Sequence, residues 1–183
     1  MPSFTMHIAI ANEYIRKHKN EIKNIKEFVK GNIYPDLTNN KNITHYGEWG
    51  NEKTNIIFEN FINDSKIDLS KDFYKGYFLH LLADDFTYNY SLKDVFDKVR
   101  KDETGKIIYE EFYYLNKFLL SKYEINNIPE EVIEFTKVKD GNLNYLKPDK
   151  VFEMIDNISS INLEEQIKYL KNNKKPKYNI KEV

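Results

Sequence analysis

Residues 77–84 have the sequence Tyr77-Phe78-Leu79-His80-Leu81-Leu82-Ala83-Asp84, an apolar run that predicts a buried helix at the centre of the fold. This helix is expected from about Ser70, a candidate N-cap, to about Tyr88. Positions i and i+4 share one face of a helix, so His80 and Asp84 lie close enough to bind one ion. A buried imidazole beside a buried carboxylate needs a partner. The spacing alone leaves two interpretations open, a hydrogen-bonded core pair or half of a metal site.

The composition indicates one globular domain with an aromatic-rich core. The chain of 183 residues is long enough for one core and short for two. It is 40% hydrophobic and 31% charged, as globular proteins are, and its 15% of aromatic residues predicts that rings fill the core. The net charge of −1 gives no electrostatic support for a stable nucleic-acid partner.

The sequence contains no cysteine, which excludes disulfides and thiolate ligands, so any metal must be bound by His, Asp or Glu. The first residues contain neither a basic segment nor a long apolar one, so no signal peptide is expected. No stretch approaches the roughly 18 apolar residues of a transmembrane segment. We therefore expect a cytoplasmic protein, of unknown oligomeric state.

Helical periodicity dominates the chain, whereas glycine, proline and alternating strand-like runs are scarce. The pattern predicts an all-α, single-domain multi-helix bundle over residues 1–175, with the metal site between helices, and a polar, frayed C-terminal tail over 176–183. Gly31 is expected to end the second helix, and residues 32–50 are expected to be irregular. The helices are expected at 5–18, 21–30, 51–63, 70–88, 91–99, 107–123, 129–138, 148–158 and 162–172.

The chain has four histidines, and three of them are candidate metal ligands. His7 opens the first helix, His45 lies in a loop and His80 lies in the central helix, whereas His18 in a basic segment is expected at the surface. Asp36 follows Tyr34-Pro35 and is either a turn-forming residue or a ligand. Imidazole and carboxylate groups suit zinc, and iron or manganese less specifically. The five candidates exceed the needs of one tetrahedral ion, which suggests two ions bridged by a carboxylate: His7, Asp36, His45, His80 and Asp84.

Other polar and aromatic residues have simpler interpretations. Asp85 is expected to be a solvated neighbour of Asp84, and Glu110 and Glu111 are expected on the solvated face of their helix. A group of aromatic side chains is more typical of core packing than of a pocket for a cationic head group. This group comprises Tyr34, Tyr46, Trp49, Phe86, Tyr88 and Tyr90.

Four segments, in order over residues 5–90, resemble the zinc-dependent phospholipase C family, which shares a superfamily with single-strand-specific zinc nucleases. They are Thr5-Met6-His7-Ile8-Ala9-Ile10-Ala11, Gly31-Asn32-Ile33-Tyr34-Pro35-Asp36, Thr44-His45-Tyr46 and Gly76-Tyr77-Phe78-Leu79-His80-Leu81-Leu82-Ala83-Asp84. The resemblance implies an all-α fold in which Asp36, His45, His80 and Asp84 bind one zinc. It also implies that Asp84 bridges to a second zinc bound by His7.

Secreted members of the family have a third site built from downstream histidines, but this chain has no histidine after His80. The expected centre is therefore reduced to one or two Zn²⁺ ions. The resemblance implies a phospholipase C-like hydrolase of phosphoric esters, acting on a small phosphoester or a phospholipid head group, in which Asp36 orients or deprotonates the attacking water. The alternatives are a non-catalytic, metal-stabilised helical binding module and a helical interaction protein with a hydrogen-bonded His/Asp core.

Overall fold

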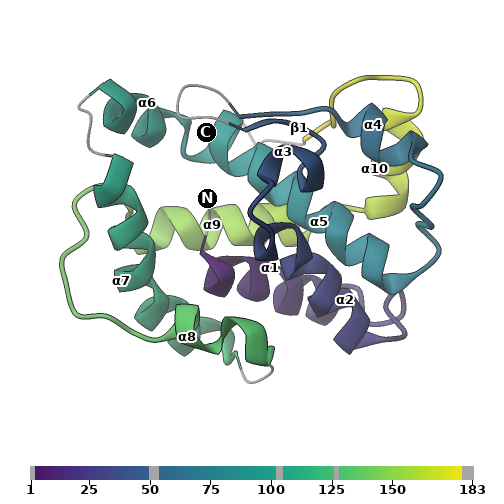
Figure 1. Ribbon diagram of the computed structural model, residues 1–183. Helices are drawn as coiled ribbons and strands as arrows, with labels where there is room; N and C mark the ends of the chain where they lie inside the picture. The colour runs from purple at the N-terminus through teal and green to yellow at the C-terminus, as the bar shows by residue number, and fades with distance from the viewer. Residues whose placement is uncertain (1–2, 50–53, 102–104, 126–127, 179–183) are drawn as a thin grey trace.

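The computed structural model describes residues 3–49, 54–101, 105–125 and 128–178, and these ranges are mostly helical (Figure 1). The all-α prediction is confirmed. The only sheet within these ranges is an antiparallel pair, β1 (Gly47–Trp49) and β2 (Thr54–Ile56). The α-helices are α1 (Phe4–Lys17), α2 (Ile25–Ile33), α3 (Lys41–Thr44), α4 (Phe58–Asn63), α5 (Asp72–Phe86), α6 (Lys93–Lys101), α7 (Gly105–Tyr123), α8 (Ile133–Thr136), α9 (Pro148–Ser159) and α10 (Leu163–Leu170).

Helix α5 is the central element, as the sequence predicts. Every residue from Gly76 to Phe86 is buried, so this part of the helix is covered on all sides and packs within the fold. It begins at Asp72 after the capping residue Lys71, whereas the predicted cap Ser70 donates its hydroxyl to Asp68. The helix contacts α1, α2 and α9, and a π-helical turn at Thr87–Ser91 continues it.

Two glycines allow α2 and α5 to cross with their backbones in contact. A Cβ atom on Gly31 would collide with the carbonyl oxygen of Phe73, and one on Gly76 would collide with that of Phe28. The prediction that Gly31 ends its helix is therefore wrong, because α2 continues to Ile33. The glycine is required by the close crossing, which brings the loop after α2 next to the middle of α5.

The predicted helix over residues 51–63 is wrong in its first half. Residues 51–53 lie outside the described ranges, Thr54–Ile56 form β2, and the helix begins only at Phe58. The backbone N–H of Ile57 donates to the carbonyl oxygen of Tyr46, which extends the pairing of the two strands by one bond. This hairpin directly follows His45 and fixes the chain on the C-terminal side of that histidine.

Glu111 on α7 is buried, in contrast to the solvated position predicted for it, whereas Glu110 is exposed as predicted. The Glu111 carboxylate accepts hydrogen bonds from the backbone N–H groups of Asn144, Tyr145 and Leu146 at 2.7 to 3.1 Å. The carboxylate therefore anchors the loop before α9 to α7.

Asp85 is also buried, which corrects the solvated position predicted for it. Its carboxylate accepts hydrogen bonds from Asn89 Nδ2 at 2.8 Å and from the hydroxyl of Tyr178 at 2.9 Å. The tail is therefore not frayed at Tyr178, whose ring also packs edge-on against Phe86. His18, predicted at the surface, is partly exposed, and its ring stacks on Tyr14.

Candidate metal centre

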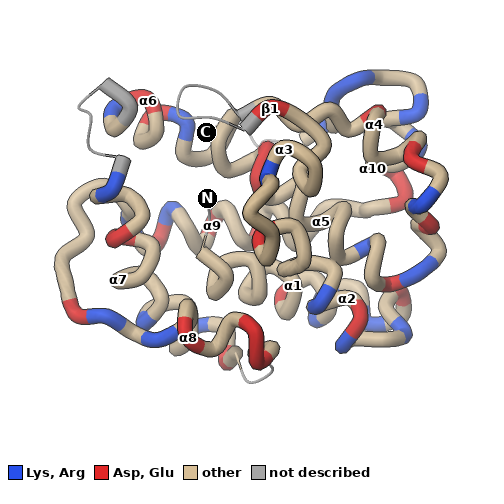
Figure 2. Tube along the Cα trace, viewed as in Figure 1, with Lys and Arg blue, Asp and Glu red and all other residues tan. Residues whose placement is uncertain are grey.

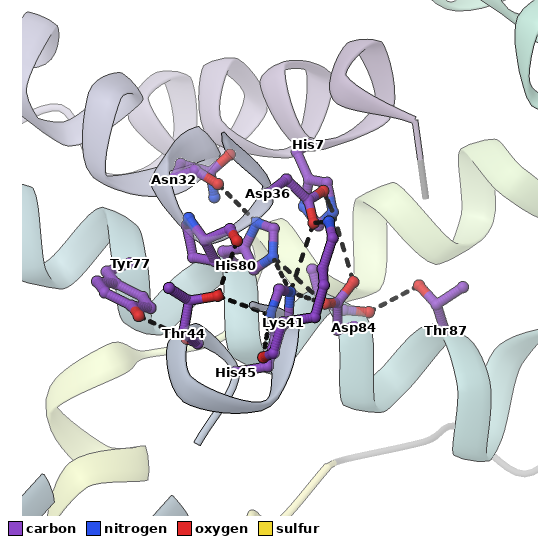
Figure 3. Close-up of polar contacts among 12 residues, drawn as sticks. His7, Asn32, Asp36, Lys41, Thr44, His45, Tyr77, His80, Asp84 and Thr87 are labelled. Atoms are coloured by element: carbon purple, nitrogen blue, oxygen red, sulfur yellow. Dashed lines mark hydrogen bonds and ion pairs between the residues drawn. The ribbon is translucent and has the colours of Figure 1, made fainter. Parts of the chain in front are cut away.

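The five predicted ligand residues converge on one buried cluster, although they come from four separate parts of the chain (Figure 3). His7 lies on α1, and His80 and Asp84 lie on α5. Asp36 lies in a 3₁₀ turn over Tyr34–Leu37, and His45 follows α3. All five side chains are at most 1% exposed.

Local hydrogen bonds fix the segment that carries Asp36 and His45. Pro35 at the start of the 3₁₀ turn restricts the backbone just before Asp36. The Thr44 hydroxyl donates to the Pro35 carbonyl oxygen at 2.9 Å, and the Tyr77 hydroxyl donates to the carbonyl oxygen of Thr44. The turn, the short helix α3 and α5 are thereby joined around the cluster.

Asp84 lies between the three histidines. Its Oδ1 is 3.4 Å from Nε2 of His7, and its Oδ2 is 3.2 Å from Nε2 of His45 and 3.3 Å from Nε2 of His80. Asp36 approaches the same group from the other side, with Oδ1 at 3.5 Å from Nε2 of His45 and Oδ2 at 3.8 Å from Nε2 of His7. Each of these three histidines therefore directs its Nε2 at a carboxylate.

The outward-facing nitrogens of His45 and His80 are held by backbone carbonyls. Nδ1 of His80 donates to Asn32 O at 2.7 Å, and Nδ1 of His45 donates to Lys41 O at 3.0 Å. This arrangement is typical of metal-binding histidines, in which the second nitrogen is fixed by an outer partner. The two Nε2 atoms are 3.1 Å apart, so in neutral rings their lone pairs face each other unless a proton or a cation lies between them.

Several buried polar atoms of the cluster lack a hydrogen bond among the described residues. They include both ring nitrogens of His7 and both carboxylate oxygens of Asp84. Two groups of ligand atoms lie close enough to bind an ion, His7 with His80 and Asp84, and Asp36 with His45 and His80. Buried nitrogen and oxygen atoms that have no hydrogen-bond partner are suitable ligands for a divalent cation such as zinc.

The buried histidines and carboxylates of the cluster shift one another's pKa values. Burial lowers the pKa of His80 to about 4, so this ring is neutral at neutral pH. Burial opposes protonation of His45 as well, but the carboxylates of Asp36 and Asp84, 3.5 and 3.2 Å from its Nε2, raise its pKa to about 9. Burial would raise the pKa of Asp36, yet the His45 hydrogen bond and the charges of nearby histidines lower it. In the ion-free protein, His45 is therefore protonated at neutral pH, with its Nε2 close to Asp36, Asp84 and Nε2 of His80.

A pocket of about 400 Å³ adjoins the cluster, and Asp36 is the residue of the five that lines it. Lys41 lines it too and forms an ion pair with Oδ1 of Asp36. Lys41 could not be recognised from the sequence, because a lysine four residues before a histidine is not diagnostic of a site. The rest of the wall is largely aromatic: Phe4, Tyr109, Phe112, Tyr113 and Phe135.

An all-α fold around a buried cluster of three histidines and two aspartates defines a candidate metal-binding protein of the zinc type. Residues 6–96, about half of the chain, match the family model described as zinc-dependent phospholipase C. The chain thus belongs to this family, as the sequence motifs indicate. No curated protein and no solved structure matches the chain.

Proposed function

We propose that the protein is a metal-dependent hydrolase of phosphoric esters. The observation that carries this proposal is the position of Asp36, which belongs both to the metal-type cluster and to the lining of the adjoining pocket. A structural metal site is closed, whereas a catalytic one has an open side where water and substrate can meet the ion. Asp36 lines the pocket, so an ion bound by Asp36 would have its open side there.

His7, Asp36, His45, His80 and Asp84 are the proposed ligands of one or two Zn²⁺ ions. A bound divalent ion would lower the pKa of a water molecule and neutralise phosphate charge. The carbonyl groups of Asn32 and Lys41 hold the His80 and His45 rings with Nε2 toward the cluster. Asp36 would orient the water on the pocket side and accept its proton, which is the catalytic role proposed for this residue.

The pocket suits a phosphoric ester of an apolar or flat alcohol, either a small phosphoester or a phospholipid head group. Among the described residues that line the pocket, Lys41 has the cationic side chain. Its ammonium can contact a phosphate oxygen at the end of the pocket where Asp36 lies. Beyond that end, the rings of Phe4 and Phe135 pack at 5.2 Å and provide an apolar surface. None of the described helices is long and apolar enough to span a membrane.

The second candidate is a non-catalytic, metal-stabilised helical module. The burial of all five candidate ligands favours it, because an ion enclosed by helices on every side would only fasten them together. The pocket at Asp36 argues for the hydrolase instead. Turnover separates the two functions.

The test is the hydrolysis of two phosphodiesters by zinc-loaded protein. One is bis(4-nitrophenyl) phosphate, and the other is a phosphodiester between 4-nitrophenol and a phospholipid head-group alcohol. We expect turnover that chelation removes and that Asp36→Asn lowers at least about 100-fold. Asp140→Asn, at an exposed position, is the matched control and should retain wild-type activity. Zinc-loaded protein that hydrolyses neither ester contradicts the proposal and favours the structural module.

A further inference from the structure

Lys41 places a positive charge directly on the candidate metal centre. Its ammonium pairs with Oδ1 of Asp36, and its side chain is 21% exposed whereas that of Asp36 is only 1% exposed. In Figure 3 the Lys41 side chain reaches across the cluster toward Asp36. Its own carbonyl oxygen accepts the Nδ1–H of His45 at 3.0 Å, so one residue holds two of the five candidate ligands.

The ammonium of Lys41 competes with a cation for the same carboxylate. The cluster contains two buried carboxylates, Asp36 and Asp84, and Lys41 already balances one of them. Two positive groups a few Å apart at a buried site repel each other strongly, because water screens them poorly. Lys41 therefore lowers the affinity of Asp36 for a divalent ion, whereas a neutral residue at position 41 would not.

The two possible ligand groups also share a histidine. One consists of His7, His80 and Asp84, and the other of Asp36, His45 and His80. Nδ1 of His80 is already bonded to the carbonyl oxygen of Asn32 at 2.7 Å. Only the Nε2 lone pair of His80 is left for coordination, and one lone pair binds one ion. The two groups cannot both be complete at the same time.

We propose that the centre binds one divalent cation tightly and that Lys41 takes the place of a second cation on Asp36. This inference rests on the proposed function, because it assigns the ion count and the second positive group of that same site. A single tightly bound ion differs from the two bridged ions that the five candidate ligands suggest in the sequence. The pocket-facing positive charge is then a property of the folded chain and does not depend on metal supply.

The test is zinc titration of metal-free full-length protein by calorimetry, with elemental analysis after gel filtration. We expect one tightly bound zinc per chain in the wild type. In Lys41→Met we expect a second zinc, bound by Asp36 and His45 without His80, with an affinity at least about tenfold higher than any second zinc has in the wild type. Lys41→Arg retains the charge and should behave as the wild type. Lys30→Met is the control, because Lys30 is an exposed lysine on α2 that pairs with Glu27.

Two tightly bound ions in the wild type, or equal zinc affinities in the wild type and Lys41→Met, would overturn the inference. Lys41→Gln supplies a second neutral variant if the methionine variant does not fold. A wild type that binds no zinc overturns both this inference and the proposed function. One tight zinc without phosphoester hydrolysis contradicts the proposed function alone, whereas hydrolysis with two tight ions contradicts this inference alone.

Discussion

Protonated His45 should make the stability of the metal-free protein depend on pH. Burial disfavours its charge, but the nearby carboxylates of Asp36 and Asp84 outweigh burial and raise its pKa from 6.5 to about 9. Because the pKa is higher in the folded state, the stabilisation is fully present below pH 6.5 and is lost as pH rises through about 9. At about 1.4 kcal/mol per pKa unit, the loss is on the order of 3 kcal/mol.

The measurement is urea unfolding in the presence of a chelator, followed by far-ultraviolet circular dichroism, at pH 6.5 and at about pH 10, above the folded-state pKa. The variant His45→Gln keeps a polar side chain but cannot titrate in this range. The wild type should lose about 3 kcal/mol more than the variant between the two pH values. Equal losses in the two proteins would refute the reasoning, since the titrating group would then lie elsewhere.

Three further variants test contacts that hold the centre in place. Gly76→Ala should cost at least about 2 kcal/mol in urea unfolding, because its Cβ would collide with the Phe28 carbonyl; an unchanged midpoint contradicts the close crossing. Glu111→Gln should cost about 2 kcal/mol and speed hydrogen exchange at the Leu146 amide; unaltered exchange would show that the carboxylate is not the anchor. Tyr178→Phe should cost about 1 kcal/mol, since Asp85 loses a donor, and unchanged stability argues against this contact.

Local spacing predicted only part of the centre, whereas His7 and His45 became candidates through their residue type and through the resemblance of their segments to the family. His80 and Asp84 are one helical turn apart, and Asp36 follows the proline that restricts its turn. The all-α fold followed from helical periodicity, which is strong in the long helices. That these side chains bind zinc stays a prediction, whereas their convergence in one buried cluster is a property of the fold.

The features that the sequence did not reveal depend on distant partners. Asp85 is buried because Tyr178, 93 residues further along, donates to it, and Glu111 is buried because it anchors a loop more than 30 residues away. The strands β1 and β2 are three residues long each, too short for an alternating pattern to be recognised. Glycine is typical of helix ends, but Gly31 is required because the backbone of α5 packs directly against it.

The most direct test of the metal centre is a crystal of zinc-supplemented protein measured above and below the zinc absorption edge. We predict an anomalous peak at about 2.0–2.1 Å from Nε2 of His80. Crystals of His80→Ala grown in the same zinc concentration should lack the peak or show it much weakened. A wild-type crystal without an anomalous peak in the cluster, or with its zinc bound only at surface residues, would contradict the account.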